Sequence, residues 1–293
     1  PLTRNVRRPP RSSMNRPLPP PTLDSTAIVR ASQSSFIPAF RLLPADRRKD
    51  LEIFYAFCRV ADDIADAPGT ALPDRYAAVE AWRAGFRDAG LRGLPDNLRE
   101  LIERRGLPRD LFLELLDGVA TDLAAPVRMA TRADLDLYCH RVAGTVGRLC
   151  LPIFGADPER AADYAETLGR ALQYTNILRD TASDLERGRI YYPLDELAVA
   201  GVESFPRDAR AYLVSFAAKT AALFDEAAAK SPPQDDRALR PARIMASVYR
   251  TLLRKMQRDG VRVTERRYRL SGPEKLLAVA RALAVRRARP RTA

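Results

Sequence analysis

From Ala27 onward the sequence keeps one helical pattern, which prolines divide into segments of helical length. Proline ends helices because it lacks a backbone N–H and clashes with the preceding turn. Strand signals are weak: Arg189–Pro193 could be extended, but no alternating partner or Asn-Gly hairpin accompanies it. The pattern therefore predicts an all-α fold built by helix packing, in a single domain over residues 24–284.

Several helix boundaries follow from local signals. A side chain that accepts a hydrogen bond from a free backbone N–H favours a helix start, and so does proline at the first helical position. Helices are therefore expected over residues 44–67, over 131–147 from a capping box of Thr131 and Asp134, over 157–187 from Asp157 and Pro158, and from a second capping box at Ser271 and Glu274.

The net charge of +12 lies mostly at the two ends of the chain. Residues 1–23 are rich in proline and hold five arginines without an acid, and residues 284–293 hold four arginines without an acid. Residues 1–23 are expected to be disordered, and residues 285–293 form a basic tail. The body between them is nearly balanced and does not demand a nucleic-acid-binding face. Such ends either rest on an anionic membrane or are solvated, and Met14 is a candidate for the true start.

Cysteine, histidine and hydropathy narrow the class further. The scattered Cys58, Cys139 and Cys150 show no C-x-x-C spacing, which favours reduced thiols in the cytoplasm over a disulfide framework. His140 cannot build a histidine metal site alone, and we interpret it as a solvated or capping side chain. Neither a transmembrane helix nor a secretory signal is expected, because no sufficiently long apolar run is present.

Two polar stripes lie where helices should bury apolar side chains. The first, in QYTNILRDTASD, consists of Gln173, Asn176, Asp180 and Asp184. The second, in FYAFCRVADDIAD, consists of Tyr55, Arg59, Asp62 and Asp66. Their offsets of three and four residues place each set on one helix face.

Each stripe contains a pair of aspartates one helical turn apart. Mg²⁺ prefers one or two carboxylates together with substrate phosphates, so both pairs suggest ions shared with a diphosphate. Acidic pairs of this spacing also occur on solvated helix faces. The metal interpretation is favoured because both pairs lie in otherwise apolar helices, and because like charges one turn apart destabilise a helix that lacks a balancing cation.

Groups that could contact a diphosphate or a long apolar chain lie nearby. Arg59 is in the second stripe, and Arg189 follows the first by a short turn; arginine suits bidentate phosphate contact. Ser35, before the first long helix, could supply a hydroxyl. In YCHRVAGTVG, small residues form one helix face, which suits either close helix packing or room for an apolar chain.

The chain resembles the squalene/phytoene synthase family, the head-to-head isoprenoid synthases, from about Ser32 to Leu276. The resemblance rests on FYAFCRVADDIAD, YCHRVAGTVG and QYTNILRDTASDLERGRIYYP, in the family's order. It implies an isoprenoid-synthase fold around a central cavity. It also implies that the aspartate pairs are the family's two D-x-x-x-D metal motifs, with Mg²⁺, or alternatively Mn²⁺, as the cofactor.

The resemblance implies a role for several further residues. The implied metal ligands are Asp62, Asp66, Asn176, Asp180 and Asp184; the implied substrate contacts are Ser35, Phe36, Arg59, Gln173, Asn176, Arg189 and Arg267; and the implied catalytic positions are Tyr55, Arg59, Tyr138 and Tyr191. Many carotenoid-type members carry a His-Ser-x-Ser-Phe segment, whereas this chain has Ser32 in place of the histidine.

The expected activity is Mg²⁺-dependent condensation of two farnesyl diphosphates to presqualene diphosphate. RLLPADRRKD, ASQSSF and RPARIMASVYRTLL are most similar to bacterial presqualene diphosphate synthases of hopanoid pathways. The alternatives are a phytoene or dehydrosqualene synthase, and a squalene synthase with an NADPH-dependent second step. A non-catalytic assembly factor of the same fold is a further alternative, although such relatives have lost metal aspartates and this chain keeps all four.

The last helical segment suggests a second kind of partner. Leu276, Leu277, Ala280 and Leu283 form an apolar stripe beside Arg281, Arg286 and Arg287. This pattern suits peripheral contact with the inner face of the cell membrane. It also suits a helix packed on the domain, which is the interpretation that we slightly favour.

Overall fold

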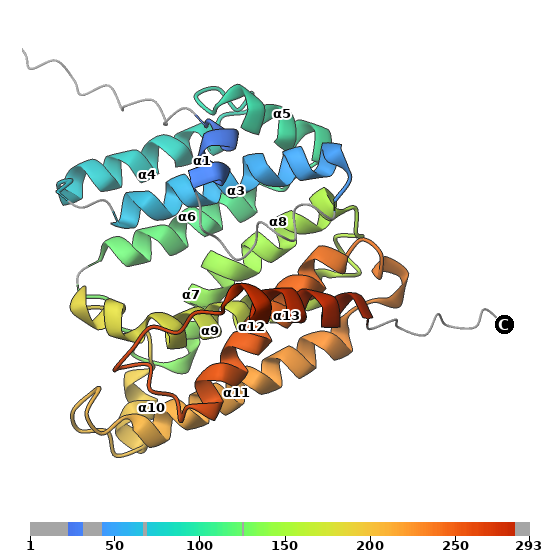
Figure 1. The fold of residues 1–293 in the computed structure, drawn as a ribbon. Helices are drawn as coiled ribbons and strands as arrows, with labels where there is room; N and C mark the ends of the chain where they lie inside the picture. Colours follow the sequence, from blue (N-terminus) through green and yellow to red (C-terminus); the bar gives the residue numbers. More distant parts are fainter. Residues whose placement is uncertain (1–22, 32–42, 67–68, 125, 285–293) are drawn as a thin grey trace, which may run out of the picture.

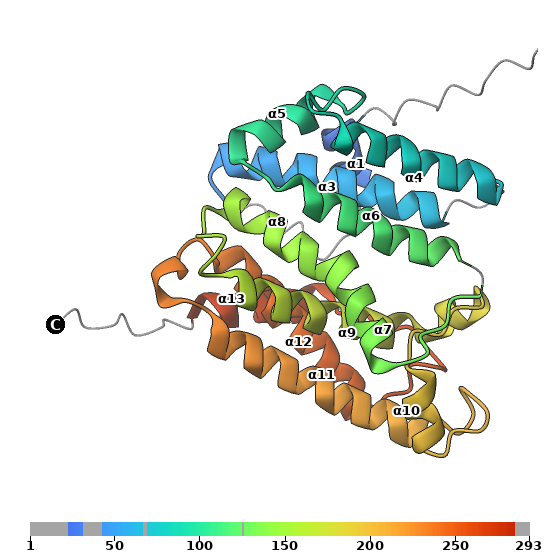
Figure 2. The same ribbon diagram turned by 180° about the vertical axis from the view of Figure 1, so that it is seen from behind.

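The computed structural model describes residues 23–31, 43–66, 69–124 and 126–284, and these residues form stacked layers of helices (Figures 1 and 2). The α-helices are α1 (Ser25–Ala31), α3 (Ala45–Asp66), α4 (Leu72–Arg87), α5 (Asp96–Arg105), α6 (Arg109–Leu123), α7 (Arg132–Cys139), α8 (Thr145–Phe154), α9 (Ala162–Glu186), α10 (Leu194–Val199), α11 (Arg210–Lys230), α12 (Arg240–Arg258) and α13 (Gly272–Ala284). A π-helical turn, η1 (His140–Gly144), joins α7 to α8, and a 3₁₀ turn, η2 (Pro233–Asp235), precedes α12. The described ranges contain no strand beyond an isolated bridge of Arg128 with Ile190, which confirms the all-α prediction.

Two of the predicted helix starts are set by the expected capping boxes. At α7, the Thr131 side chain accepts from the backbone N–H of Asp134 while the Asp134 carboxylate accepts from the backbone N–H of Thr131. At α13, Ser271 and Glu274 make the same reciprocal pair. α3 also covers the predicted range almost residue for residue.

The predicted start of α9 is wrong by about one turn. The Asp157 side chain accepts from the backbone N–H groups of Glu159 and Arg160, at 3.0 and 2.9 Å. These bonds stabilise a separate turn, and α9 itself begins at Ala162. Asp157 therefore caps this preceding turn and does not cap the start of α9.

The helix predicted over residues 131–147 contains a π turn and continues into α8. A Cβ on Gly169 of α9 would lie 2.6 Å from the carbonyl oxygen of Ala143, and one on Gly147 would lie 2.8 Å from that of Ala165. Close packing therefore explains the small residues of this segment. Ala143 and Gly147 also line the central cavity, so both interpretations of the small face apply.

An aromatic cluster fixes α3 against its neighbours. Phe57 lies with ring centroids 5.1 Å from Trp82, 5.5 Å from Phe86 and 5.4 Å from Phe112, which joins α3 to α4 and α6. All four side chains are buried, and edge-to-face pairs of this kind add to the hydrophobic gain. The second stripe of aspartates is therefore carried on a rigidly held helix.

α9 lies at the centre of the fold and packs against α7, η1, α8, α11 and α12 (Figures 1 and 2). This central position explains its many buried residues. Cys58, Cys139 and Cys150 are free thiols, as expected. No helix in the described ranges is long and apolar enough to cross a membrane.

His140 is not the solvated or capping residue that we expected. Its Nδ1 lies 2.8 Å from the Glu166 carboxylate of α9, and its Nε2 lies 2.8 Å from the Glu114 carboxylate of α6. Partial burial disfavours the imidazolium, but hydrogen bonds and charge from Glu166 and Glu114 outweigh this effect and raise the pKa of His140. The side chain therefore links two helices across η1.

We expect the contribution of His140 to stability to depend on pH. Because its folded pKa lies above the ordinary value of 6.5, the contribution is complete below pH 6.5 and is lost as pH rises through the folded pKa. Replacing His140→Gln should cost roughly 0.5–1 kcal/mol at about pH 6 and less at about pH 9, since all three groups are partly exposed. Thermal unfolding followed by circular dichroism at both pH values checks this, and an equal loss at both would contradict it.

Candidate active site

A cavity of about 890 Å³ lies between the helices. Its walls come from α3, α6, the α7–η1–α8 segment, α9 and α12. Most of the wall is apolar and includes Phe54, Val119, Val146, Leu168 and Leu252. Polar side chains gather toward the C-terminal ends of α3 and α9, so one end of the cavity is charged and the rest is apolar.

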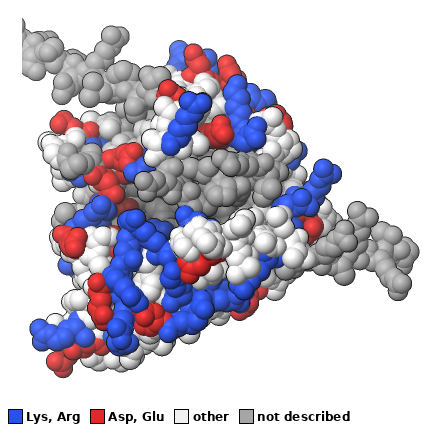
Figure 3. Space-filling view, viewed as in Figure 1, with Lys and Arg blue, Asp and Glu red and all other residues white. Residues whose placement is uncertain are grey.

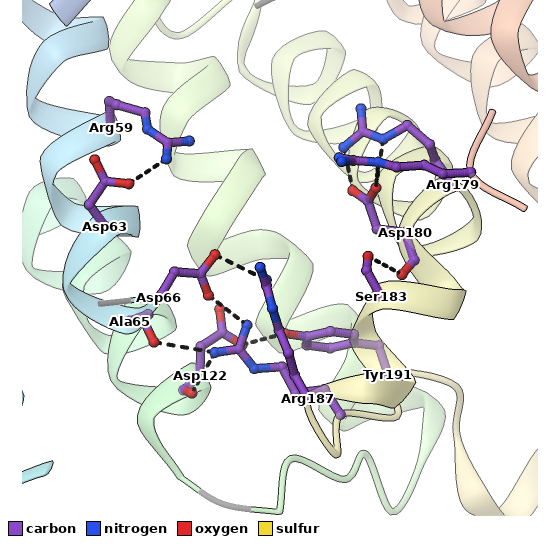
Figure 4. Close-up of polar contacts among 12 residues, drawn as sticks. Arg59, Asp63, Ala65, Asp66, Asp122, Arg179, Asp180, Ser183, Arg187 and Tyr191 are labelled. Atoms are coloured by element: carbon purple, nitrogen blue, oxygen red, sulfur yellow. Dashed lines mark hydrogen bonds and ion pairs between the residues drawn. The ribbon is translucent and has the colours of Figure 1, made fainter. Parts of the chain in front are cut away.

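The four aspartates of the two stripes all line this cavity. Asp62 and Asp66 come from α3, and Asp180 and Asp184 come from α9. In Figure 4, Asp66 and Asp180 lie on opposite sides of the charged end. Each pair sits near the C-terminal end of its helix, where the helix dipole is negative and disfavours further negative charge. A cation bound between these carboxylates would therefore be stabilised by them and by the two helix ends.

Arginines from the segment after α9 cross the charged end to α3. The Asp66 carboxylate accepts from Arg189 at 3.0 Å and from Arg187 at 3.1 Å. A second guanidinium nitrogen of Arg189 lies 3.3 Å from the carbonyl oxygens of Ala65 and Asp122. Figure 4 shows Arg187 reaching toward Asp66 from the opposite wall. Two cationic groups thus lie at the charged end of the cavity, bound to Asp66.

The remaining predicted arginines also line the cavity. Arg267 Nε lies 2.7 Å from the Asp180 carboxylate, which Arg179 also contacts. Arg59 pairs with the exposed Asp63 rather than with Asp62. Both arginines line the cavity, Arg59 held by Asp63 beside the first pair and Arg267 held by Asp180 of the second pair.

Asp122 of α6 was missed by the sequence analysis. Tyr191 donates to Asp122 Oδ1 at 2.7 Å, and Tyr138 donates to Asp122 Oδ2 at 3.0 Å. The two phenol rings are stacked with centroids 5.0 Å apart. A signal was available, because Leu115, Val119 and Asp122 follow steps of four and three residues, which places a carboxylate on an apolar helix face.

The surroundings of Asp62 and Asp184 favour the protonated form of each carboxyl group. Desolvation, with the charges of Asp122, Asp66 and Asp63, raises the pKa of Asp62 to about 7 despite the nearby Arg59, although the side chain stays accessible to solvent. Desolvation and the charge of Asp180 likewise raise the pKa of Asp184 to about 7. A cation at this end would reverse both effects by favouring the ionised forms.

The donor set fits Mg²⁺ shared with a substrate. Across the described ranges, no three His, Cys, Asp or Glu side chains gather closely enough to hold an ion by themselves. The buried amide oxygen of Asn176 has no hydrogen-bond partner in the described part of the chain, and its amide nitrogen lies 3.3 Å from Gln173 Oε1. Carboxylate and amide oxygens suit a hard cation that completes its shell with water and phosphate.

The structure places the other predicted residues as follows. Tyr55, Gln173 and Asn176 line the cavity between its charged end and its apolar part. Ser35 and Phe36 lie outside the described residues. Besides Asp122, the analysis of the sequence missed Arg179 and Arg187, and it missed the wall formed by Ala242, Met245, Val248, Tyr249 and Leu252 of α12.

The sequence and the structure of this chain are both similar to those of known proteins. The family model for squalene/phytoene synthases matches residues 29–274. The chain belongs to the squalene/phytoene synthase family. The structure also resembles a solved dehydrosqualene synthase, with a TM-score of 0.76 and 25% identity over 89% of this chain and 94% of that one. A squalene synthase from Alicyclobacillus acidocaldarius gives a TM-score of 0.69 and 28% identity over 80% and 92%. The predicted isoprenoid-synthase fold is confirmed.

Curated relatives within the family have two kinds of name. The presqualene diphosphate synthase of Zymomonas mobilis is 43% identical over 61% of this chain, and the match spans 63% of that relative's length. The one of Rhodopseudomonas palustris is 40% identical over 58% of this chain and 61% of its own length. The phytoene synthase of Thermus thermophilus is 38% identical over 90% of this chain and 93% of its own length.

We expect Mg²⁺ to raise the melting temperature more at about pH 8 than at about pH 6. The folded pKa of Asp62 and Asp184 is about 7 against an ordinary 3.8, so without a cation stability falls as pH rises between these values. Above pH 7 the cation replaces the proton. At one hundred times its dissociation constant it adds about 2.7 kcal/mol, or roughly 5 °C or more.

The variant Asp62→Asn with Asp184→Asn should abolish this pH-dependent gain in melting temperature. Asp163→Asn is the matched control, because Asp163 lies on α9 like Asp184 but is exposed in the first turn of that helix, away from the cavity. Differential scanning fluorimetry measures all three proteins. A gain that survives in the double variant would show that the cation binds elsewhere.

Proposed function

We propose that this chain condenses two farnesyl diphosphates head-to-head to give presqualene diphosphate. The observation that carries the proposal is a single cavity with aspartates and arginines at one end and apolar walls over the rest. A substrate with a diphosphate and a long hydrocarbon chain matches this division. The volume of about 890 Å³ is near the upper end of ordinary ligand pockets, which suits two prenyl chains.

The charged end would bind and activate the diphosphate of one substrate. Arg59, Arg189 and Arg267 supply guanidinium groups that suit bidentate phosphate contact. Asp62, Asp66, Asp180, Asp184 and Asn176 would hold Mg²⁺, which when bound supplies positive charge that stabilises a leaving diphosphate. The allylic C–O bond of the first substrate then breaks, and the diphosphate leaves with the electron pair.

The walls of the cavity direct the cation that remains. Apolar side chains exclude the water that would otherwise quench it. The C2–C3 double bond of the second substrate attacks C1 of the first, and loss of one proton from that carbon closes a cyclopropane. Desolvation and the charge of Asp122 raise the pKa of Tyr191 above its ordinary value, so this phenol stays protonated. The released diphosphate is therefore favoured over Tyr191 as the proton acceptor.

Tyr138 and Tyr191 have a second role in this proposal. Both hydroxyls donate to Asp122, and both side chains line the cavity. Electron-rich oxygen atoms next to the reacting carbons would stabilise positive charge. Asp122 acts here as a positioning residue for the two phenols.

The product assay tests the proposal directly. The purified chain with Mg²⁺ and farnesyl diphosphate should form presqualene diphosphate, identified by mass spectrometry, with or without NADPH. Phytoene from geranylgeranyl diphosphate, without turnover of the C15 substrate, would instead support the carotenoid alternative. Squalene formed only with NADPH would show a second step, and no turnover of either substrate would favour the assembly-factor alternative.

Removing one aspartate from either pair should abolish turnover. Asp62→Ala or Asp180→Ala is expected to lower kcat at least about a hundredfold, because each removes a charge that the transition state requires. Asp163→Ala, in the exposed first turn of α9, is the matched control and should change kcat little. Circular dichroism shows whether each variant keeps its helical fold, and a well-folded Asp62→Ala variant with full activity would refute the role of this pair.

Asp122→Asn should lower kcat about tenfold with little change in KM. The amide nitrogen that replaces one carboxylate oxygen cannot accept, so one of the two hydroxyls must turn away. A tenfold loss corresponds to about 1.4 kcal/mol, close to the lower limit of about 1.5 kcal/mol for one hydrogen bond to a charged group. Asp110→Asn, at the exposed start of the same helix, is the control. Unchanged steady-state kinetics in a folded Asp122→Asn variant would exclude the positioning role.

A further inference from the structure

The last described helix, α13, turns its apolar residues outward. Leu276, Leu277 and Leu283 are 71%, 51% and 45% exposed, and Ala280 is also exposed. Their spacing places them on one helix face. A surface helix normally buries such a stripe against the core, so the orientation of α13 is the reverse of the usual one.

The inner face of α13 is held by other contacts. Ala278 is fully buried, and its carbonyl oxygen accepts from the Ser247 hydroxyl of α12 at 2.7 Å. Lys255 Nζ of α12 lies 2.9 Å from the Glu274 carboxylate. These contacts attach the helix to the domain. The outward leucines are therefore available for a contact beyond the fold.

Positive charge borders this apolar face on one side. In Figure 3 a white surface covers the region of α13, and blue side chains border it below. Between residues 254 and 281 the exposed arginines are Arg254, Arg258, Arg262, Arg266, Arg267, Arg269 and Arg281. Over the same stretch, which lies entirely within the described ranges, Glu265 is the one exposed acid. The partner of this face should therefore combine an apolar phase with negative charge.

We propose that the outer face of α13 docks on an anionic lipid bilayer. The leucines would enter the boundary between head groups and acyl chains. The exposed arginines beside them, apart from Arg267, which pairs with Asp180 in the cavity, would contact the lipid phosphates. A second copy of the chain is a poorer occupant, because a symmetric contact through this face would bring the arginines of both copies together.

The position of α13 beside the cavity also favours a lipid bilayer as its partner. Leu270, just before α13, and Lys275, in its first turn, both line the cavity. A bilayer on the outer face of α13 would therefore lie beside the wall of the cavity. An apolar reactant or product would then have a short path between protein and membrane. Binding itself requires no turnover and goes beyond the proposed function.

Vesicle co-sedimentation with the full chain tests the proposal. The wild type should bind vesicles of phosphatidylcholine mixed with phosphatidylglycerol, and bind vesicles of phosphatidylcholine alone less well. Leu276→Glu with Leu277→Glu should weaken binding to the mixed vesicles at least about tenfold, because two apolar side chains no longer enter the bilayer. Both proteins keep the same basic ends, so the comparison isolates α13.

The matched control is Val199→Glu with Val214→Glu. These valines are 91% and 46% exposed on α10 and α11, away from α13, and the control should bind like the wild type. Equal loss in both double variants would overturn the proposal, and so would undiminished binding of the leucine variant. A dimer in gel filtration without vesicles, lost only in the leucine variant, would identify a second copy as the occupant instead.

Discussion

Five carboxylates converge on one end of a cavity that is otherwise apolar, and much of the surrounding structure offsets their repulsion. Asp62, Asp66, Asp122, Asp180 and Asp184 all line that end. Arg189 and Arg187 reach Asp66 from the segment after α9, Arg267 reaches Asp180 from the segment before α13, and two phenols donate to Asp122. Balancing this charge ties together α3, α6, α7, α9 with the segment after it, and the segment before α13. The site is thereby prepared for anionic phosphate together with a cation.

The repulsion can be maintained because the helices that carry the carboxylates cannot move apart easily. α3 is fixed by the Phe57 aromatic cluster, and α9 is fixed by glycine contacts that let η1 and α8 approach its backbone. Large-to-small changes in such packing cost about 3–5 kcal/mol for an aromatic residue. The apolar core thus supplies the free energy that holds like charges near one another. Desolvation first, and the neighbouring carboxylates second, raise the pKa of Asp62 and Asp184.

Much of the fold and the outline of the site could be predicted from local sequence signals. Proline positions and capping boxes gave the helices, and the spacing of Asp62/Asp66 and Asp180/Asp184 gave two of the faces that line the cavity. Contacts between distant segments were not predictable in this way. Helical periodicity says which face of α6 contains Asp122, but not that Tyr138 and Tyr191 meet it. For the same reason His140 was taken as solvated, although Glu114 and Glu166 approach it from two other helices.

The π turn at His140–Gly144 has a consequence for the shape of the cavity. Tyr138, Val142, Val146, Cys150 and Phe154 line the cavity at intervals of four residues. In a regular α-helix a row with this interval drifts by about 40° at each step, because one turn holds 3.6 residues. The wider turn of η1 reduces that drift and keeps the row facing inward along most of one wall. The direction of this part of the apolar wall, from Tyr138 to Val146, is therefore encoded partly in the hydrogen bonding of five backbone units and not in side chains alone.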